Sequence, residues 1–145
     1  MLEVLVVMGI FVLVSGFALL FSMDSFRGST FQGDRDLLVS LLQRARAQSV
    51  SNMCTAVGCT DGKSHGVAVV GDTYVLFEGG SYATRTTAAD SVFSSSQTVT
   101  RSGDTEVVFS QLAGTTTAQK VFTLNYGSLV SAITVEPNGR IWWTN

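Results

Sequence analysis

The chain has 145 residues, of which 46% are hydrophobic and 14% are charged, with a formal net charge of −2 and a sequence pI near 5.2. Beyond one long apolar stretch at the start, roughly 120 residues remain, which is enough for a single core and gives no sign of a second domain. Because no basic run is present, the chain-wide charge does not favour binding to nucleic acid or to an anionic lipid surface.

The first element is an apolar stretch from Val4 to Met23 that contains no charged side chain. About twenty residues of α-helix reach about 30 Å, the thickness of the hydrocarbon core of a bilayer, so we expect a helix long enough to span a membrane. Glu3 stands at the end of this stretch. An ionised carboxylate next to hydrocarbon is costly unless it reaches the headgroups, is neutralised or finds a partner. A headgroup position and a functional pairing are both open for Glu3.

Three explanations compete for the apolar stretch. A cleaved secretory signal has a basic region at its start and a site of small residues, but no Lys or Arg precedes Arg27 and the sequence FSMDSF is a poor site. A single-pass anchor fits the length, although the basic flanking residues that normally set its orientation are missing before the span. The third explanation is a filament subunit.

This third explanation comes from a resemblance. The sequence MLEVLVVMGIFVLV resembles the start of a mature type IV pilin or type II secretion pseudopilin, in which a leader is removed before an apolar helix that carries one Glu. The family places this Glu slightly further along, after a methylated Phe, so Met1 is not expected to be the mature end.

The resemblance implies a structural subunit of a type IV pilus-like filament and no enzymatic activity. The subunit would wait in the inner membrane, be processed by a prepilin peptidase, and be added by the pilus assembly machinery to a helical homo-oligomer outside the cell. Glu3 would pair with the N-terminal amine of a neighbouring subunit. The residues expected to carry assembly are Glu3, Val4, Val7, Ile10, Phe11 and Val14.

The next element is an amphipathic helix predicted from about Asp34 to Val50, with an apolar stripe formed by Leu38, Leu41, Leu42 and Ala45. Between it and the apolar stretch, Gly28 and Gly33 predict either a continuous helix with a weak point or a short break. The expected divisions are residues 1–24 for the apolar helix, 25–53 for the amphipathic helix and 54–145 for the β-domain.

The charged side chains of this helix have two interpretations. Arg44 and Arg46 either face the acids of a neighbouring chain or lie on a solvated face. Asp34 and Asp36 are two apart and point to different sides, which suits stabilisation of the dipole at a first helical turn better than catalysis.

Cys54 and Cys59 enclose four residues, and we expect a disulfide that closes a small loop. A zinc site would need two further ligands, and His65 and Asp61 are weak candidates for them. Redox chemistry usually uses C-x-x-C at the start of a helix. No metal and no cofactor is therefore predicted.

From His65 onward the apolar period changes to two, which predicts six or seven antiparallel strands. Gly71 and Asp72 suit a hairpin turn, and Pro137 to Gly139 suit another. The predicted strands are HGVAVV, TYVLFE, QTVTR, EVVFSQL, KVFTLN, SAITVE and RIWWT. The predicted fold class is α+β and pilin-like, with the long N-terminal helix packed on an antiparallel β-sheet. The side chains expected to face the helix are Val67, Val69, Val75, Phe77, Val108, Phe122 and Leu124.

Two segments resemble one branch of the family more closely. DLLVSLLQRARAQSVSNM and ITVEPNGRIWW are similar to the pseudopilin H and FimT-like branch, with Leu41, Leu42, Ala45, Arg46 and Ser49 at the matching helical positions. Members of that branch sit at tips, and some bind DNA. This leaves a minor pilin or a pseudopilin of type II secretion or DNA uptake as an alternative to a major subunit.

The segment GGSYATRTTAADSVFSSSQT, residues 79–98, is rich in Gly, Ser and Thr and is expected to be a surface loop. It would be the contact region of a different class of protein, a monomeric binding module anchored in the membrane at the cell surface.

No catalytic motif is present in the sequence. We expect His65 to be a surface or strand-end residue. Trp142 and Trp143 occupy adjacent strand positions and point to opposite faces, so one is expected in the core and the other, Trp143, remains a candidate contact.

Overall fold

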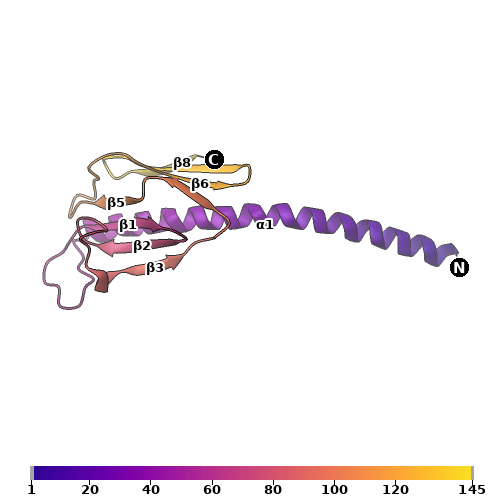
Figure 1. The fold of residues 1–145 in the computed structure, drawn as a ribbon, viewed down its shortest axis with the longest axis horizontal. Coiled ribbons are helices and arrows are strands. Elements are labelled where there is room, and N and C mark those ends of the chain that lie inside the picture. Colours follow the sequence, from indigo (N-terminus) through magenta and orange to yellow (C-terminus); the bar gives the residue numbers. More distant parts are fainter. Residues whose placement is uncertain (1, 145) are drawn as a thin grey trace.

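The computed structural model describes residues 2–144, and within the helix it describes the side chains of residues 3, 4, 6–16 and 28–50. One helix, α1 (Leu2–Val50), is followed by strands and a short 3-10 helix, η1 (Thr87–Ala89). In Figure 1 the N-terminal half of α1 extends away from the strands, which gather around its C-terminal half. The strands are β1 (His65–Val70), β2 (Thr73–Glu78), β3 (Ser91–Ser94), β4 (Thr100–Gly103), β5 (Glu106–Phe109), β6 (Lys120–Tyr126), β7 (Leu129–Val135) and β8 (Ile141–Thr144).

The strands form two sheets, and this corrects the predicted fold class. The first sheet has the order β3-β2-β1-β5 and the second has the order β4-β6-β7-β8, with antiparallel pairing throughout. A pilin-like α+β fold with one antiparallel sheet of six or seven strands is therefore wrong, because the described residues form eight strands in two sheets. Strand periodicity indicates which residues are extended, but it does not indicate how the strands divide between sheets.

Helix α1 runs without a break through the region of Gly28 and Gly33, so the non-helical break, one of our two alternatives, is absent there. A Cβ atom added at either glycine would meet no atom within 4 Å, so neither glycine is required by close packing within this chain. The predicted helix from Asp34 to Val50 is confirmed as the C-terminal part of α1, and the expected division at residues 24 and 25 falls inside one continuous helix.

The core forms where the C-terminal half of α1 meets both sheets. The predicted stripe is confirmed, since Leu38, Leu41, Leu42 and Ala45 are all buried. Complete burial of one such leucine contributes about 1.5–3 kcal/mol, so this stripe holds the helix to the domain. The side chains from the strands and from the bend before β4 in the same cluster are Val67, Tyr74, Leu76, Val99, Val107, Phe109, Phe122, Leu124, Ile133 and Val135.

The predicted face of the first sheet is partly wrong. Val75, Phe77 and Val108 belong to a second cluster, and Tyr74 and Leu76 lie in the main core in their place. Strand β2 reads TYVLFE, with apolar or aromatic residues at successive positions, so the sequence carries no alternation that could tell one face from the other. If the assignment of alternate residues to the two faces is shifted by one position, every side chain of the strand moves to the opposite face.

The second cluster corrects the prediction of a simple surface loop at residues 79–98. This segment contains η1 and strand β3. The Tyr82 ring contacts the Phe77 ring edge-on, with centroids 5.7 Å apart, so the segment covers the outer face of the first sheet. Strand β3 has a burial pattern typical of a half-exposed edge, which explains why its apolar signal is weak.

A buried ion pair connects α1 to both sheets. Asp34 Oδ2 accepts hydrogen bonds from Arg101 Nη2 of β4 at 2.8 Å and from the Tyr74 hydroxyl of β2 at 2.9 Å. Asp34 Oδ1 accepts the Ser96 N–H at 3.1 Å. Burial raises the pKa of Tyr74, which keeps its hydroxyl as a donor. The expected role of Asp34 at a first helical turn is therefore wrong, because the helix is continuous and its carboxylate joins three elements.

Asp104 provides a pH-dependent contact between β6 and the turn after β4. Burial alone would raise the pKa of Asp104, but hydrogen bonds from Lys120 Nζ at 2.9 Å and Val121 N–H at 2.8 Å outweigh it and hold the pKa below its ordinary value. A lowered carboxyl pKa stabilises the fold above the unfolded pKa, near 4, and this contribution is lost as the pH falls through the folded pKa.

We therefore expect Asp104→Asn to lower the melting temperature at pH 7 and to leave it close to that of the wild type at pH 2, measured by circular dichroism. Lys120→Met keeps the Val121 hydrogen bond, so it should give a smaller loss at pH 7. An equal loss for Asp104→Asn at both pH values would show that the charge of Asp104 contributes nothing.

Candidate functional site

The main candidate surface is the free N-terminal part of α1, residues 4–14, which we call the apolar rod. Its described side chains are at least half exposed, from 50% for Val7 to 72% for Val12. The others are Val4, Val6, Met8, Ile10, Phe11, Leu13 and Val14. All the predicted assembly residues are exposed, and they lie on the apolar rod except Glu3, which directly precedes it on the same helix.

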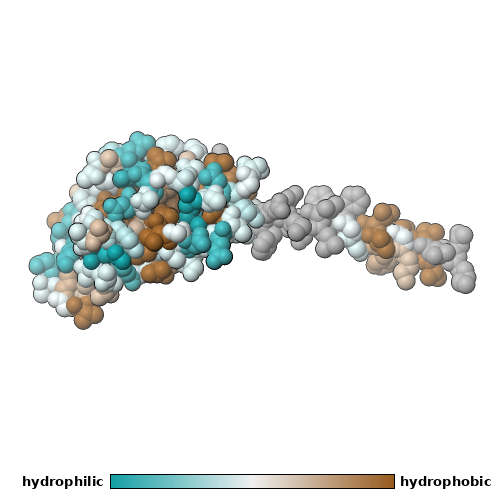
Figure 2. All heavy atoms as spheres, in the orientation of Figure 1, coloured by the Kyte–Doolittle hydropathy of each residue, from teal (hydrophilic) through white to brown (hydrophobic). Residues whose placement is uncertain are grey.

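The apolar rod is hydrophobic on all sides and not along one stripe. Val4, Val7, Phe11 and Val14 follow helical spacing on one side, and Val12 lies on another. Figure 2 shows these apolar side chains gathered near the far end of the helix, away from the mixed surface of the domain. A helix that is apolar all round belongs in a dry environment, so this surface needs a cover that the single chain does not supply.

No helical segment among the side chains that the structure describes is long and apolar enough to cross a membrane. The predicted span from Val4 to Met23 is described only in its first part, since side chains 17–27 lie outside the described residues.

The other predicted contact residues lie on the domain, apart from the apolar rod. Arg44 and Arg46 are exposed, and Arg46 Nε donates to Gly114 O at 3.2 Å. Trp142 and Trp143 are 38% and 43% exposed, so the expectation that one of them lies in the core is wrong. Strand β8 is an edge strand with one neighbour, and this leaves both indoles open to solvent.

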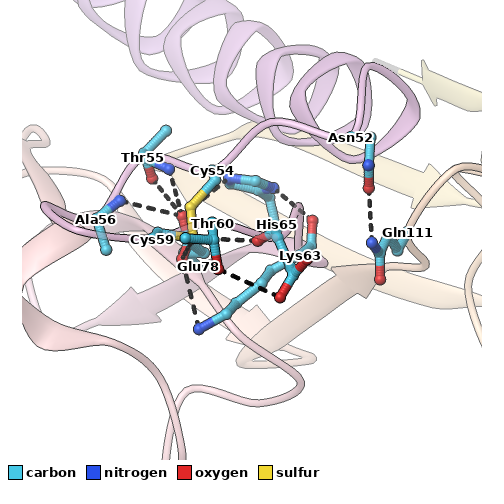
Figure 3. The surroundings of a disulfide bond; sticks show 11 residues. Asn52, Cys54, Thr55, Ala56, Cys59, Thr60, Lys63, His65, Glu78 and Gln111 are labelled. Carbon is cyan, nitrogen blue, oxygen red and sulfur yellow. Dashed lines mark hydrogen bonds and ion pairs between the residues drawn. A yellow bond between two sulfur atoms is a disulfide. The ribbon is translucent and has the colours of Figure 1, made fainter.

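A second candidate site is the disulfide loop, residues 54–59. The predicted disulfide is confirmed: Cys54 and Cys59 are bonded, with Cα atoms 5.9 Å apart. Glu78 of β2 fixes this loop through hydrogen bonds. Its Oε2 accepts the Thr55 N–H at 2.6 Å, the Thr55 hydroxyl at 2.7 Å and the Ala56 N–H at 3.4 Å. Figure 3 shows the loop, the carboxylate and the neighbouring His65 together.

The electrostatics of this site follow from burial. Glu78 is fully buried, and burial alone would raise the pKa of its carboxyl, but the hydrogen bonds from Thr55 and Ala56 lower the pKa below its ordinary value. Burial lowers the pKa of His65, although the Glu78 charge opposes this effect. His65 is 1% exposed, so the expectation of a surface residue is wrong, while its place at the start of β1 is confirmed.

Sequence reasoning missed Glu78 altogether. It ends an apolar strand, TYVLFE, where a carboxylate normally marks an exposed strand end. The available signal was the cluster of polar residues around the two cysteines. A buried acid is expected only where hydrogen-bond donors are supplied, and these residues are such donors.

Ser49 joins the end of α1 to the first sheet. Its hydroxyl oxygen accepts the His65 N–H at 2.8 Å and the hydroxyl donates to Phe109 O at 3.1 Å, and the residue is fully buried. Ser49 therefore positions the start of β1, and with it His65, against the disulfide loop.

We expect Ser49→Ala to destabilise the domain by about 1–3 kcal/mol, because it removes the partner of two buried backbone groups. The matched control is Ser40→Ala, an exposed serine of the same helix, whose effect should stay within about 0.5 kcal/mol. Urea unfolding followed by tryptophan fluorescence measures both, and equal stability of the two variants would contradict the role of Ser49.

Comparisons of the chain with family models, with curated proteins and with solved structures find no match.

Proposed function

We propose that this chain is a structural subunit of a type IV pilus-like filament, assembled through the apolar rod, with the strands forming the outer domain. The observation that carries the proposal is the exposure of the apolar side chains of residues 4–14 around the whole helix. A domain with its own complete core would gain nothing from such a segment unless another apolar partner covers it.

Side-by-side packing of rods from several chains would supply that cover. In the membrane, lipid covers the rod, and a bundle of identical rods is equally dry, so extraction from lipid into the filament need cost little. Gly9 on the rod and Gly16 just beyond it are one heptad apart, and a Cβ at either position would meet no atom within 4 Å in this chain. Small residues at such positions allow the backbones of neighbouring helices to approach closely.

In this proposal, Glu3 sets the axial offset between neighbouring subunits. It is exposed at the end of the rod, within the first helical turn. Pairing of its carboxylate with the N-terminal amine of a neighbouring subunit would neutralise both charges in the dry bundle, and an unpaired charge there would be strongly unfavourable. The pair therefore favours one axial offset between neighbours over others.

Two alternatives share the same rod. A minor pilin or pseudopilin would occupy only the tip of a filament. A monomeric binding module would leave its rod in the membrane, covered by lipid alone.

Immuno-electron microscopy of sheared surface material, with an antibody against residues 60–145, separates these functions. A major subunit labels fibres along their length, and this is the result we expect. Label confined to fibre ends would identify a tip subunit. Label on membrane fragments only, with unlabelled fibres, would contradict the proposal and favour the anchored module.

A further inference from the structure

The disulfide loop and the strands beneath it bring together four side chains whose atoms commonly bind transition metals. Cys54, Cys59 and Glu78 each offer one sulfur or oxygen atom, and these atoms lie within 4.8 Å of one another. His65 Nε2 lies 3.8 Å from Glu78 Oε2. Figure 3 shows the four side chains gathered where the loop meets β1 and β2. This cluster plays no part in the proposed filament assembly.

His65 is oriented like a metal ligand. Its Nδ1 lies 3.0 Å from Lys63 O, and since a carbonyl only accepts, Nδ1 carries the proton and Nε2 keeps its lone pair. The side chain is 2% exposed, and Nε2 has no hydrogen-bond partner among the described residues. A histidine that binds metal typically donates its other ring N–H to a carbonyl or carboxylate in this way.

The Glu78 carboxylate is also oriented like a metal ligand. Its Oε2 accepts the hydrogen bonds from Thr55 and Ala56, which fix the carboxylate. Its Oε1 lies 3.9 Å from Cys59 Sγ and is paired with Lys63 Nζ at 3.9 Å, so a metal on the side of the cysteines would replace this exposed lysine at the carboxylate. Outer hydrogen bonds of this kind hold ligating carboxylates in metal sites.

We propose that reduction of the disulfide converts this corner into a zinc site with Cys54, Cys59, His65 and Glu78 as ligands. Four intervening residues between the cysteines fall within the spacing found in structural zinc sites, and two sulfurs, one imidazole and one carboxylate form a tetrahedral ligand set. Two Zn–S bonds of about 2.3 Å at tetrahedral angles place the sulfurs about 3.8 Å apart, so the exposed loop opens slightly. The same loop is thus closed by a covalent bond when oxidised and by the metal when reduced.

The chemistry balances with a trialkylphosphine as reductant. The phosphine attacks one sulfur, the S–S bond breaks, and water converts the phosphorus to phosphine oxide while both sulfurs become thiols. Zn²⁺ then displaces the two thiol protons, which pass to the buffer. Zinc itself is neither oxidised nor reduced.

The test uses the full chain in detergent, reduced with a phosphine and kept without oxygen. Zn²⁺ is titrated in competition with a coloured chelator, and Co²⁺ is added to a second sample for absorption spectroscopy. The reduced chain should bind one metal ion and give the spectrum of tetrahedral cobalt with thiolate charge-transfer bands. The oxidised chain and Cys54→Ser should show neither. Absence of stoichiometric binding by the reduced chain would overturn the proposal.

Variants identify the remaining ligands. His65→Gln and Glu78→Gln should each weaken zinc binding on the order of 10-fold or more. The matched control is Asp61→Asn, an exposed carboxylate close to His65 in sequence, which should bind zinc like the wild type. Since buried positions tolerate substitution poorly, X-ray absorption at the zinc edge of the wild-type chain gives an independent count. Two sulfur and two nitrogen or oxygen ligands, with at least one imidazole, are expected. Sulfur and water ligands alone would remove His65 and Glu78 from the site.

Discussion

Glu3→Ala is expected to abolish filaments or reduce their yield severely, while the domain stays folded. A charge left alone in a dry helical bundle costs on the order of 3–5 kcal/mol, which at each subunit addition corresponds to a shift in the assembly equilibrium of more than 100-fold. Glu3 lies in the first turn of α1, and the first buried side chain among those that the structure describes is Phe31, so removal of Glu3 should leave the core unchanged. The measurement is the amount of subunit in the sheared fibre fraction.

The matched control is Asp36→Ala, which removes an exposed carboxylate from the same helix. This variant should assemble like the wild type, and circular dichroism should show the same thermal unfolding for Glu3→Ala and for the unmodified chain. Normal fibre length and yield in Glu3→Ala would remove Glu3 from the account of assembly.

Arg101→Met is expected to cause the largest loss of domain stability, about 3–5 kcal/mol, because it leaves the Asp34 carboxylate buried without its cation. The two side chains are 8% and 2% exposed, and their nitrogen and oxygen atoms lie 2.8 Å apart. Arg101 also donates to the carbonyls of Ser96 and Val99, so one side chain orders the segment before β4. Chemical denaturation of the full chain in detergent measures the loss.

Adding Asp34→Asn to Arg101→Met removes the unpaired charge and should restore part of the lost stability, which gives the pair a measurable coupling energy. Arg140→Met is the control, since Arg140 is exposed, and its effect should stay within about 0.5 kcal/mol. If the double variant is no more stable than Arg101→Met alone, the buried charge of Asp34 is not the source of the loss.

The sequence predicts well those features that depend on local order. The amphipathic stripe of α1, the β1–β2 hairpin and the disulfide were all predictable, because helical spacing, a turn with Gly71 at φ +55° and two close cysteines are local signals. The apolar character of residues 4–14 was equally evident, because it is read directly from the sequence.

Features that depend on contacts between distant segments were not predictable. The division into two sheets rests on pairings such as β4 with β6 and β1 with β5, which join residues far apart in the chain. The buried positions of Asp34, His65 and Glu78 arise because other elements supply partners, whereas Asp and Glu are usually exposed and His is intermediate in burial. The face of β2 was wrong because six consecutive positions carry no polar alternation.

In the proposed filament, the apolar rod is covered by rods of other copies of this chain. A photoreactive benzophenone amino acid in place of Phe11, which is 69% exposed, tests this in cells that assemble the protein. Irradiation should give a ladder of cross-linked multimers whose linked peptides both come from residues 4–16, and the same group at the fully exposed Val57 should give no such peptide pairs. Adducts to lipid alone at position 11, with the chain remaining monomeric after irradiation, would show that lipid and not a second rod covers the helix.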